Sequence, residues 1–95
     1  MRSWLFPWQR RLEINKLRFV MYTRANCHLC HEAWSQLEEA QRRHGFQLTA
    51  VDIDTDPKLV AHYGECVPVV EVDGKVRFRG RVNPVLLARL LDTIP

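Results

Sequence analysis

Two cysteines separated by two residues are the side chains of this sequence best suited to chemistry. Cys27 and Cys30 enclose His28 and Leu29, and a dithiol of this spacing can alternate between thiol and disulfide forms. Cys27 falls where a strand pattern gives way to a helix pattern, and free N–H groups and the helix dipole stabilise a thiolate at such a place. Cysteines there have pKa values of roughly 3.5 to 7.5. We expect Cys27 to be the more acidic thiol and Cys30, one turn inside the helix, the more buried one.

The elements on either side of the dithiol follow from hydrophobic periodicity. Residues 17–23 combine β-branched and aromatic side chains and are predicted to form a strand. A helix is expected from residues 27–29 to His44, and Gly45 is suited to end it. Its apolar positions recur at helical spacing, at Ala33, Trp34, Leu37 and Ala40.

The second half of the chain contains a further strand, a short helix, a hairpin and a last helix. Residues 47–54 are mostly apolar, so strand, helix and strand suggest a right-handed parallel βαβ unit. Asp56 and Pro57 are suited to start a helix that ends at Tyr63. Residues 68–72 and 75–79 read as a hairpin around a type I′ turn at Asp73-Gly74. Asn83-Pro84 opens the last helix, whose apolar stripe consists of Val82, Leu86, Leu87, Leu90, Leu91 and Ile94. The predicted order is βαβαββα.

Composition limits the class of protein. The chain has 95 residues, of which 46% are hydrophobic and 26% charged, which is typical of one globular domain and not of a disordered chain. The net charge of +3 is too small to indicate nucleic-acid binding, and no binding motif supports it. Three cysteines are an odd and small number for a secreted disulfide scaffold, so we expect a reducing, cytoplasmic location. No apolar run is long enough to span a membrane.

Residues 1–16 stand apart in composition from residues 17–95. Trp4, Phe6 and Trp8 precede Arg10 and Arg11, with neither a continuous apolar core nor a small-residue cleavage site. We interpret residues 1–16 as an N-terminal extension that packs loosely or stays mobile, and residues 17–95 as the folded domain. A basic and aromatic membrane anchor is the alternative interpretation, although anchoring usually needs a second signal.

Taken together, these motifs resemble the glutaredoxin-like proteins of the thioredoxin superfamily. The resemblance rests on Tyr22 to Cys30, on Val51-Asp52-Ile53-Asp54, on Val67-Pro68, and on the Asp73-Gly74 hairpin with Gly80. It implies a thioredoxin-like, glutaredoxin-type α/β fold with a mixed four-stranded sheet and flanking helices. It also implies a monomeric thiol–disulfide oxidoreductase that reduces protein disulfides or glutathione mixed disulfides. In that reaction Cys27 attacks the substrate disulfide and Cys30 resolves the mixed disulfide.

The same resemblance suggests further binding residues. Arg24 stands three residues before the first cysteine, where glutaredoxins carry a lysine, and a cation there can hold a glutathione carboxylate. The matching proline of the family follows a cis bond, so a cis Val67–Pro68 bond is expected to present the Val67 backbone to a thiol-bearing peptide. His28 could stabilise the thiolate when protonated.

The chain departs from the family after the hairpin. Gly80-Arg81-Val82-Asn83 keeps one glycine and lacks the acidic residue that caps glutathione in many glutaredoxins. A glutathione-linked and a thioredoxin-linked reductant therefore both remain open.

The same cysteines match the patterns of other chemistry. Cys27-His28-Leu29-Cys30-His31 matches the attachment motif of c-type haem, and Cys27, Cys30, His31 and Cys66 could form a zinc site. An iron–sulfur cluster that bridges two chains through Cys27 is a third possibility. We expect no metal at the dithiol. The alternatives to an oxidoreductase are nevertheless a metal-binding or cluster-binding module and a redox-inert adaptor of the same fold.

Overall fold

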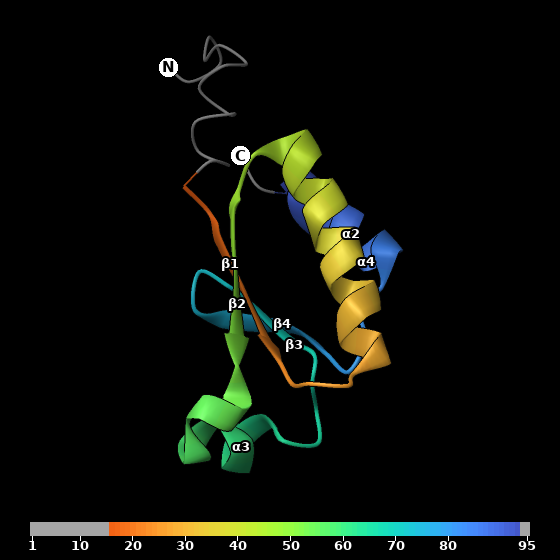
Figure 1. The fold of residues 1–95 in the computed structure, drawn as a ribbon. Helices are drawn as coiled ribbons and strands as arrows, with labels where there is room; N and C mark the ends of the chain where they lie inside the picture. Colours follow the sequence, from red (N-terminus) through yellow and green to blue (C-terminus); the bar gives the residue numbers. More distant parts are fainter. Residues whose placement is uncertain (1–15, 94–95) are drawn as a thin grey trace, which may run out of the picture.

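A mixed four-stranded sheet forms the centre of the computed structural model, which describes residues 16–93. The strands are ordered β2-β1-β3-β4 (Figure 1), with β1 parallel to β2 and antiparallel to β3, and β3 antiparallel to β4. Their bounds are Arg18–Thr23 for β1, Gln47–Asp52 for β2, Val69–Val72 for β3 and Lys75–Arg79 for β4. This confirms the predicted order of elements and the parallel βαβ unit.

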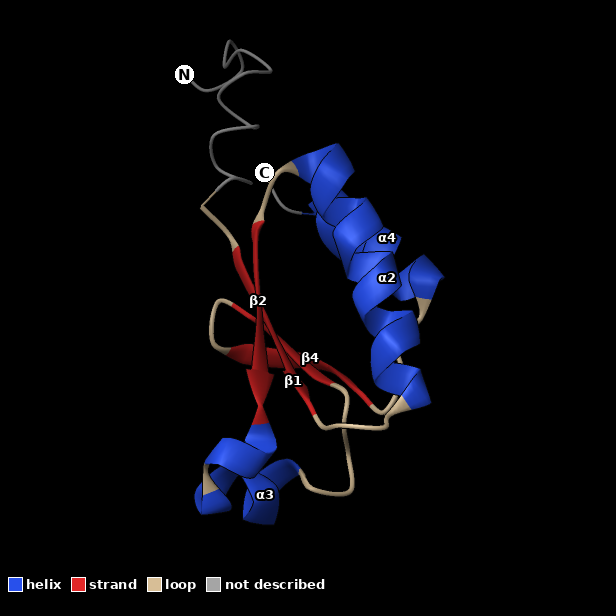
Figure 2. Ribbon diagram, in the orientation of Figure 1, coloured by secondary structure: helices blue, strands red, loops and turns tan. Residues whose placement is uncertain are grey.

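The helices lie on opposite sides of the sheet. Helix α2 (His28–His44) and helix α4 (Pro84–Thr93) lie side by side on one face (Figure 2). Helix α3 (Pro57–Tyr63) lies beyond the carboxyl end of β2, after the short 3₁₀ helix η2 (Ile53–Thr55), and packs on the other face. The sheet therefore has an α2 side and an α3 side.

The helix ends follow local signals that are visible in the sequence. Gly45 has a φ of 83° and ends α2 by donating its N–H to the carbonyl of Gln41 at 2.7 Å. The Asp56 side chain accepts the N–H of Lys58 at 2.9 Å and begins α3. Asn83 accepts N–H groups of the first turn of α4, as predicted.

Three predicted strand boundaries were wrong. The first strand begins at Arg18, not at residue 17. The second strand ends at Asp52, not at residue 54, because the Asp52 side chain accepts the N–H of Asp54 at 2.9 Å and turns the chain into η2. The third strand begins at Val69, since Pro68 has no N–H for a strand ladder. Ile94 and all but the last residue of the predicted N-terminal extension, residues 1–16, lie outside the described residues.

The core consists of two clusters of unequal size. The larger lies between the sheet and helices α2 and α4, where Phe19 stacks on Phe46 with ring centroids 4.0 Å apart. Its other members include Met21, Cys30, Ala33, Leu37, Val70, Val72, Phe78 and Leu87. The smaller cluster, on the α3 side, is formed around Ile53, Tyr63 and Val69. Among residues 16–93, no helix has the length and apolar character needed to cross a membrane.

Candidate redox site

Cys27 and Cys30 are joined by a disulfide at the start of α2, with their Cα atoms 5.2 Å apart. Asn26, with a φ of 59°, turns the chain in the left-handed region that asparagine tolerates, and Cys27 then takes the N-cap position of the helix. Cys30 is only 3% exposed, whereas Cys27 is half-buried. Cys27 is therefore the residue of the pair that an incoming molecule can reach.

The start of α2 is suited to hold negative charge on the Cys27 sulfur. The backbone N–H of Cys30 donates to the Sγ of Cys27 at 3.1 Å, and the first turn of the helix carries no acidic side chain. A hydrogen bond to the charged form and the positive end of the helix dipole both stabilise a thiolate. This arrangement thus favours the thiolate form of a reduced Cys27.

The loop before β3 lies against the same apolar cluster as Cys27. The Val67–Pro68 peptide bond is cis, Pro68 is buried, and Val67 is half-buried beside the larger cluster. The Gly80 N–H donates to the carbonyl of Cys66 at 2.9 Å and to that of Pro68 at 2.8 Å. Gly80, which follows β4, therefore fixes the backbone of this loop on both sides of Val67.

Arg24 fastens the loop that leads to Cys27. Its Nη2 and Nε atoms donate to the Asp54 carboxylate at 2.7 and 3.3 Å, and its Nη1 donates to the carbonyl of Gly64 at 3.1 Å. The guanidinium holds the pKa of Asp54 below its usual range through this hydrogen bond. Arg24 thus joins the loop to η2 and to the end of α3, and its expected contact with glutathione stays a prediction. His28 is exposed in the first turn of α2, and its role also stays a prediction.

On the α3 side, a carboxylate joins two tyrosines that sequence reasoning did not connect. Glu71 accepts hydrogen bonds from the hydroxyls of Tyr22 and Tyr63, each at 3.2 Å, and the two rings lie 4.9 Å apart. Burial, followed by the Glu71 carboxylate, raises the pKa of each tyrosine above its usual value. An acidic residue between Val70 and Val72 was the one signal in the sequence that could have indicated this cluster.

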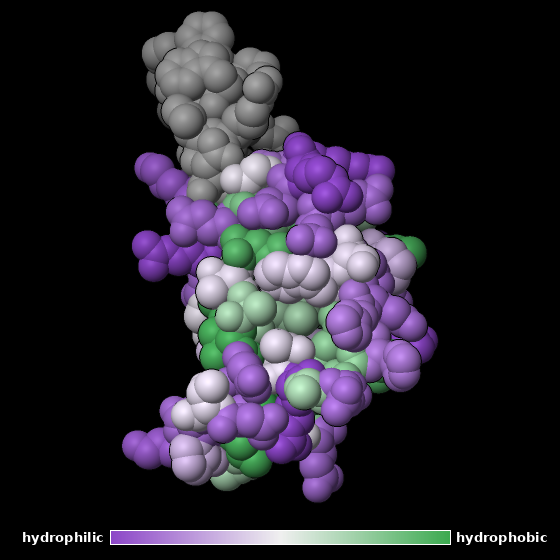
Figure 3. Space-filling model, in the orientation of Figure 1, coloured by the Kyte–Doolittle hydropathy of each residue, from purple (hydrophilic) through white to green (hydrophobic). Residues whose placement is uncertain are grey.

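A groove of about 390 Å³ runs beside the disulfide on the α2 side. We call it the dithiol groove. Figure 3 shows this face of the molecule, with a pale and green band between hydrophilic surfaces above and below it. The groove is lined by Cys27, Cys30 and Trp34 from the start of α2 and by Met21 and Ala50 from the strands.

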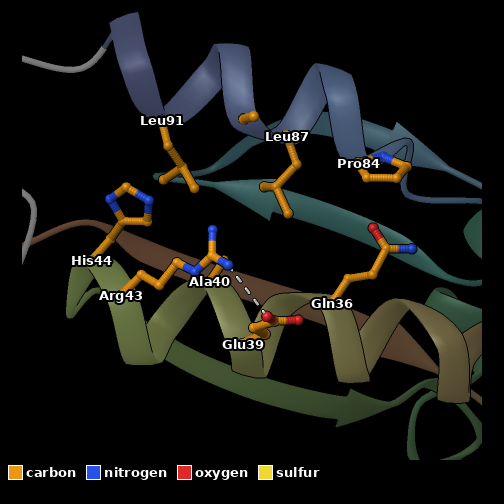
Figure 4. A pocket seen from close by; sticks show the side chains of 9 residues that line it. Gln36, Glu39, Ala40, Arg43, His44, Pro84, Leu87 and Leu91 are labelled. Carbon is orange, nitrogen blue, oxygen red and sulfur yellow. Dashed lines mark hydrogen bonds and ion pairs between the residues drawn. The ribbon is translucent and has the colours of Figure 1, made fainter.

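A second hollow lies between α2 and α4, along the half of α2 away from Cys27 (Figure 4). Its volume is about 180 Å³, and Leu87 and Leu91 line it from α4. The Glu39 and Arg43 side chains lie at its α2 wall and pair across 3.5 Å. Of the two hollows, therefore, only the dithiol groove is lined by cysteine. Within residues 16–93, His, Cys, Asp and Glu side chains do not gather in threes that could hold a metal ion.

Comparison with known proteins points to one family. A family model described as Glutaredoxin-like domain (DUF836) matches residues 18–92. An uncharacterized protein of Mycobacterium tuberculosis is 35% identical over 60 residues, which are 58% of this chain and 62% of that protein. The chain thus matches less than two thirds of the length of that relative.

Solved structures show the same fold. A structural-genomics target from X. campestris is 34% identical, covers 81% of this chain and 99% of its own, and has a TM-score of 0.66. The Nitrosomonas europaea protein Ne2328 is 26% identical over 79% of this chain and 91% of its own, with a TM-score of 0.69. A malaria parasite thioredoxin-2, at 18% identity over 82% of each chain and a TM-score of 0.62, shares the fold. The predicted thioredoxin-like fold is confirmed, and the family and the Cys27–Cys30 pair support a redox role.

Proposed function

The chain belongs to the glutaredoxin-like domain family, and we propose that it is a dithiol–disulfide oxidoreductase that reduces protein disulfides or glutathione mixed disulfides. The observation that supports this most directly is the Cys27–Cys30 disulfide at the start of α2, with the reachable cysteine at the N-cap and the buried one in the first turn.

The proposed reaction begins with the reduced dithiol. The Cys27 thiolate attacks one sulfur of the substrate disulfide, forms a mixed disulfide with it and releases the other sulfur as a thiolate. Cys30 loses its proton to solvent and attacks the Cys27 sulfur, which closes the Cys27–Cys30 bond and releases the second substrate thiolate. Two electrons pass from the dithiol to the substrate, and the released thiolates take up protons from solvent.

The chain's own groups support each step. The Cys30 N–H and the start of α2 stabilise the attacking thiolate, and the 5.2 Å between the Cα atoms allows the bond to close. We propose that the Val67 backbone binds the substrate chain, that Arg24 and His28 contribute charge near Cys27, and that glutathione or a thioredoxin-linked donor re-reduces the disulfide.

The test is reduction of hydroxyethyl disulfide and of a glutathionylated protein, with glutathione and with thioredoxin as alternative electron donors. Cys27→Ser should abolish the activity with every donor, since the attacking sulfur is gone. Cys30→Ser should accumulate mixed disulfides that intact-mass spectrometry detects. Activity that survives Cys27→Ser, or equal alkylation rates of the two reduced thiols at pH 6, would reject the assignment.

A further inference from the structure

The two edges of the described sheet differ in charge. On β4 the exposed side chains are Lys75, Arg77 and Arg79, and charged residues of this kind prevent a sheet edge from pairing with another chain. Strand β2 reads Gln-Leu-Thr-Ala-Val-Asp and carries no charge before its last residue. The β2 edge therefore lacks the protection that the β4 edge has.

Every second residue of β2 points its backbone N–H and C=O away from the sheet. The Gln47 N–H donates to the carbonyl of Leu17 at 2.9 Å, on the β1 side. Main-chain groups alternate along a strand, so those of Thr49 and Val51 also face β1, whereas those of Leu48 and Ala50 face outward. Among residues 16–93, no strand pairs with this outer edge. An extended polypeptide could therefore add to β2 through main-chain hydrogen bonds.

The dithiol groove begins at this edge and ends at the disulfide. The groove is lined by Ala50 on β2, by Met21 on β1, and by Cys27, Cys30 and Trp34 at the start of α2. In Figure 3 the pale and green band covers this part of the face. Because both cysteines line the groove, a molecule that fills it lies beside the reacting sulfur. That molecule is most simply the substrate of the dithiol.

The charges around the groove do not favour a small anion. Asp52 lines the groove from β2, and the Arg24 guanidinium in its lining is already paired with Asp54 across 2.7 Å. Apart from the cysteines, the other ionisable side chain of the lining is His31 on α2. Glutathione carries two carboxylates and has no large apolar side chain for a site lined by Met21 and Trp34. The groove thus suits an uncharged side chain attached to an extended main chain.

We propose that an extended segment of a disulfide-bearing protein substrate adds to the β2 edge and places an apolar side chain in the dithiol groove. This inference rests on the proposed oxidoreductase function and names its substrate class as polypeptide disulfides in preference to glutathione disulfides. Main-chain pairing with β2 supplies affinity for the part of the segment away from the substrate cysteine, and the Val67 backbone contacts the part beside that cysteine. The groove selects an apolar residue between the two.

The experiment compares two substrates and three variants of the full chain. Insulin presents its disulfides on polypeptide, whereas hydroxyethyl disulfide has no main-chain amides. Ala50→Lys puts a long charged side chain into the groove, and Ala50→Pro removes an outward N–H that a substrate strand would need. Each should lower kcat/KM for insulin by about tenfold and leave hydroxyethyl disulfide reduction within about twofold, as expected for losing one part of an extended interface. Ser35→Lys adds the same charge at an exposed position of α2 outside the groove and should change neither rate.

The outcomes separate this proposal from the one it rests on. A wild-type protein that reduces neither substrate rejects the oxidoreductase function itself. A normal rate with insulin in folded Ala50→Lys, or an equal fall with both substrates, overturns the β2 site alone. If Ala50→Pro fails to fold by circular dichroism, Ala50→Lys decides the question. A wild-type dimer in light scattering that Ala50→Lys converts to monomer would mean that a second copy occupies the edge, which also overturns the proposal.

Discussion

Under α2 and α4 the sheet buries apolar side chains, whereas under α3 it surrounds the Glu71 carboxylate with two tyrosine hydroxyls. The α2 side holds the larger cluster and the disulfide. The α3 side holds a smaller cluster, and the Arg24–Asp54 ion pair lies at its end. The two sulfurs of the disulfide are thus supported by packing, and polar contacts on the other side hold the loops near them.

The polar contacts of the α3 side connect the loop before Cys27 with the segment that leads to Val67. Tyr22 lies five positions before Cys27 and Tyr63 lies four positions before Val67, and both donate to Glu71. Arg24 joins the first loop to the carbonyl of Gly64, next to Tyr63. If this division is correct, variants on the α2 side should mainly change the stability of the fold, and variants on the α3 side should mainly change pH-dependent properties.

The largest effect is expected from the packing of α2. Leu37 has no exposed surface in the larger cluster, so Leu37→Ala should lower the free energy of unfolding by about 3 kcal/mol. Leu59 is half-buried on the α3 side, and Leu59→Ala should cost about 1 kcal/mol. Leu29, exposed on α2, serves as the control, and Leu29→Ala should change stability by less than about 0.5 kcal/mol. Urea unfolding measures all three, and equal losses for Leu37 and Leu59 would contradict the comparison.

A smaller effect is expected from Glu71. Glu71→Gln should cost about 1 kcal/mol, as for one weakened pair of hydrogen bonds. The chain has two tyrosines, and both donate to Glu71, so the tyrosinate absorbance at 295 nm reports this cluster alone. The midpoints of the wild-type tyrosine titrations should lie above the usual tyrosine pKa of about 10. Glu71→Gln should lower these midpoints only part of the way towards that usual value, because burial remains the larger cause of the raised pKa.

The sign of the accompanying pH dependence follows from these raised pKa values. Above about pH 10 the folded protein keeps tyrosine protons that the unfolded chain has lost, so stability should fall as the pH rises through that range. Glu71→Gln should make this fall shallower. Wild-type midpoints at the ordinary tyrosine pKa would show that the cluster does not form in solution.

The smallest effect is expected from the exposed Arg24–Asp54 pair. Arg24 lowers the pKa of Asp54, so the folded state binds the carboxyl proton less readily than the unfolded chain. The pair's stabilisation is therefore present above the ordinary Asp pKa of about 4 and is lost as the pH falls below it. Asp54→Asn should reduce the difference in Tm between pH 6 and pH 3. Asp92→Asn, at an exposed position on α4, should leave that difference unchanged, and the same change in both variants would reject the role of the pair.

Structural features set by residues close together in the sequence were predicted, whereas contacts between residues far apart in the sequence were not. Gly45, Asp56 and Asn83 ended or began helices as predicted, because caps act within four residues. The Cys27–Cys30 spacing and the start of α2 are equally local. Arg24 and Asp54 are 30 residues apart and Tyr22 and Glu71 are 49 apart, so their contacts depend on how the loops and strands meet.

The dithiol groove was also beyond prediction from sequence. It exists because α2 leaves part of β2 uncovered, so that Ala50 is exposed although it lies in a mostly apolar strand. Periodicity indicates which residues of a strand share a face, but it does not indicate how far a helix covers that face. Trp34, one of the apolar positions of the predicted helix, is half-buried beside the groove.

The position of Trp34 gives the protein an optical property. Trp34 lies one helical turn after Cys30, and both line the dithiol groove beside the disulfide. A disulfide close to an excited indole accepts an electron from it and quenches its emission, and two thiols quench far less. Reduction should therefore brighten the fluorescence of Trp34 over the background of Trp4 and Trp8, and Trp34→Phe should remove the change. The fluorescence of Trp34 should thus report the oxidation state of the dithiol in real time without an added dye.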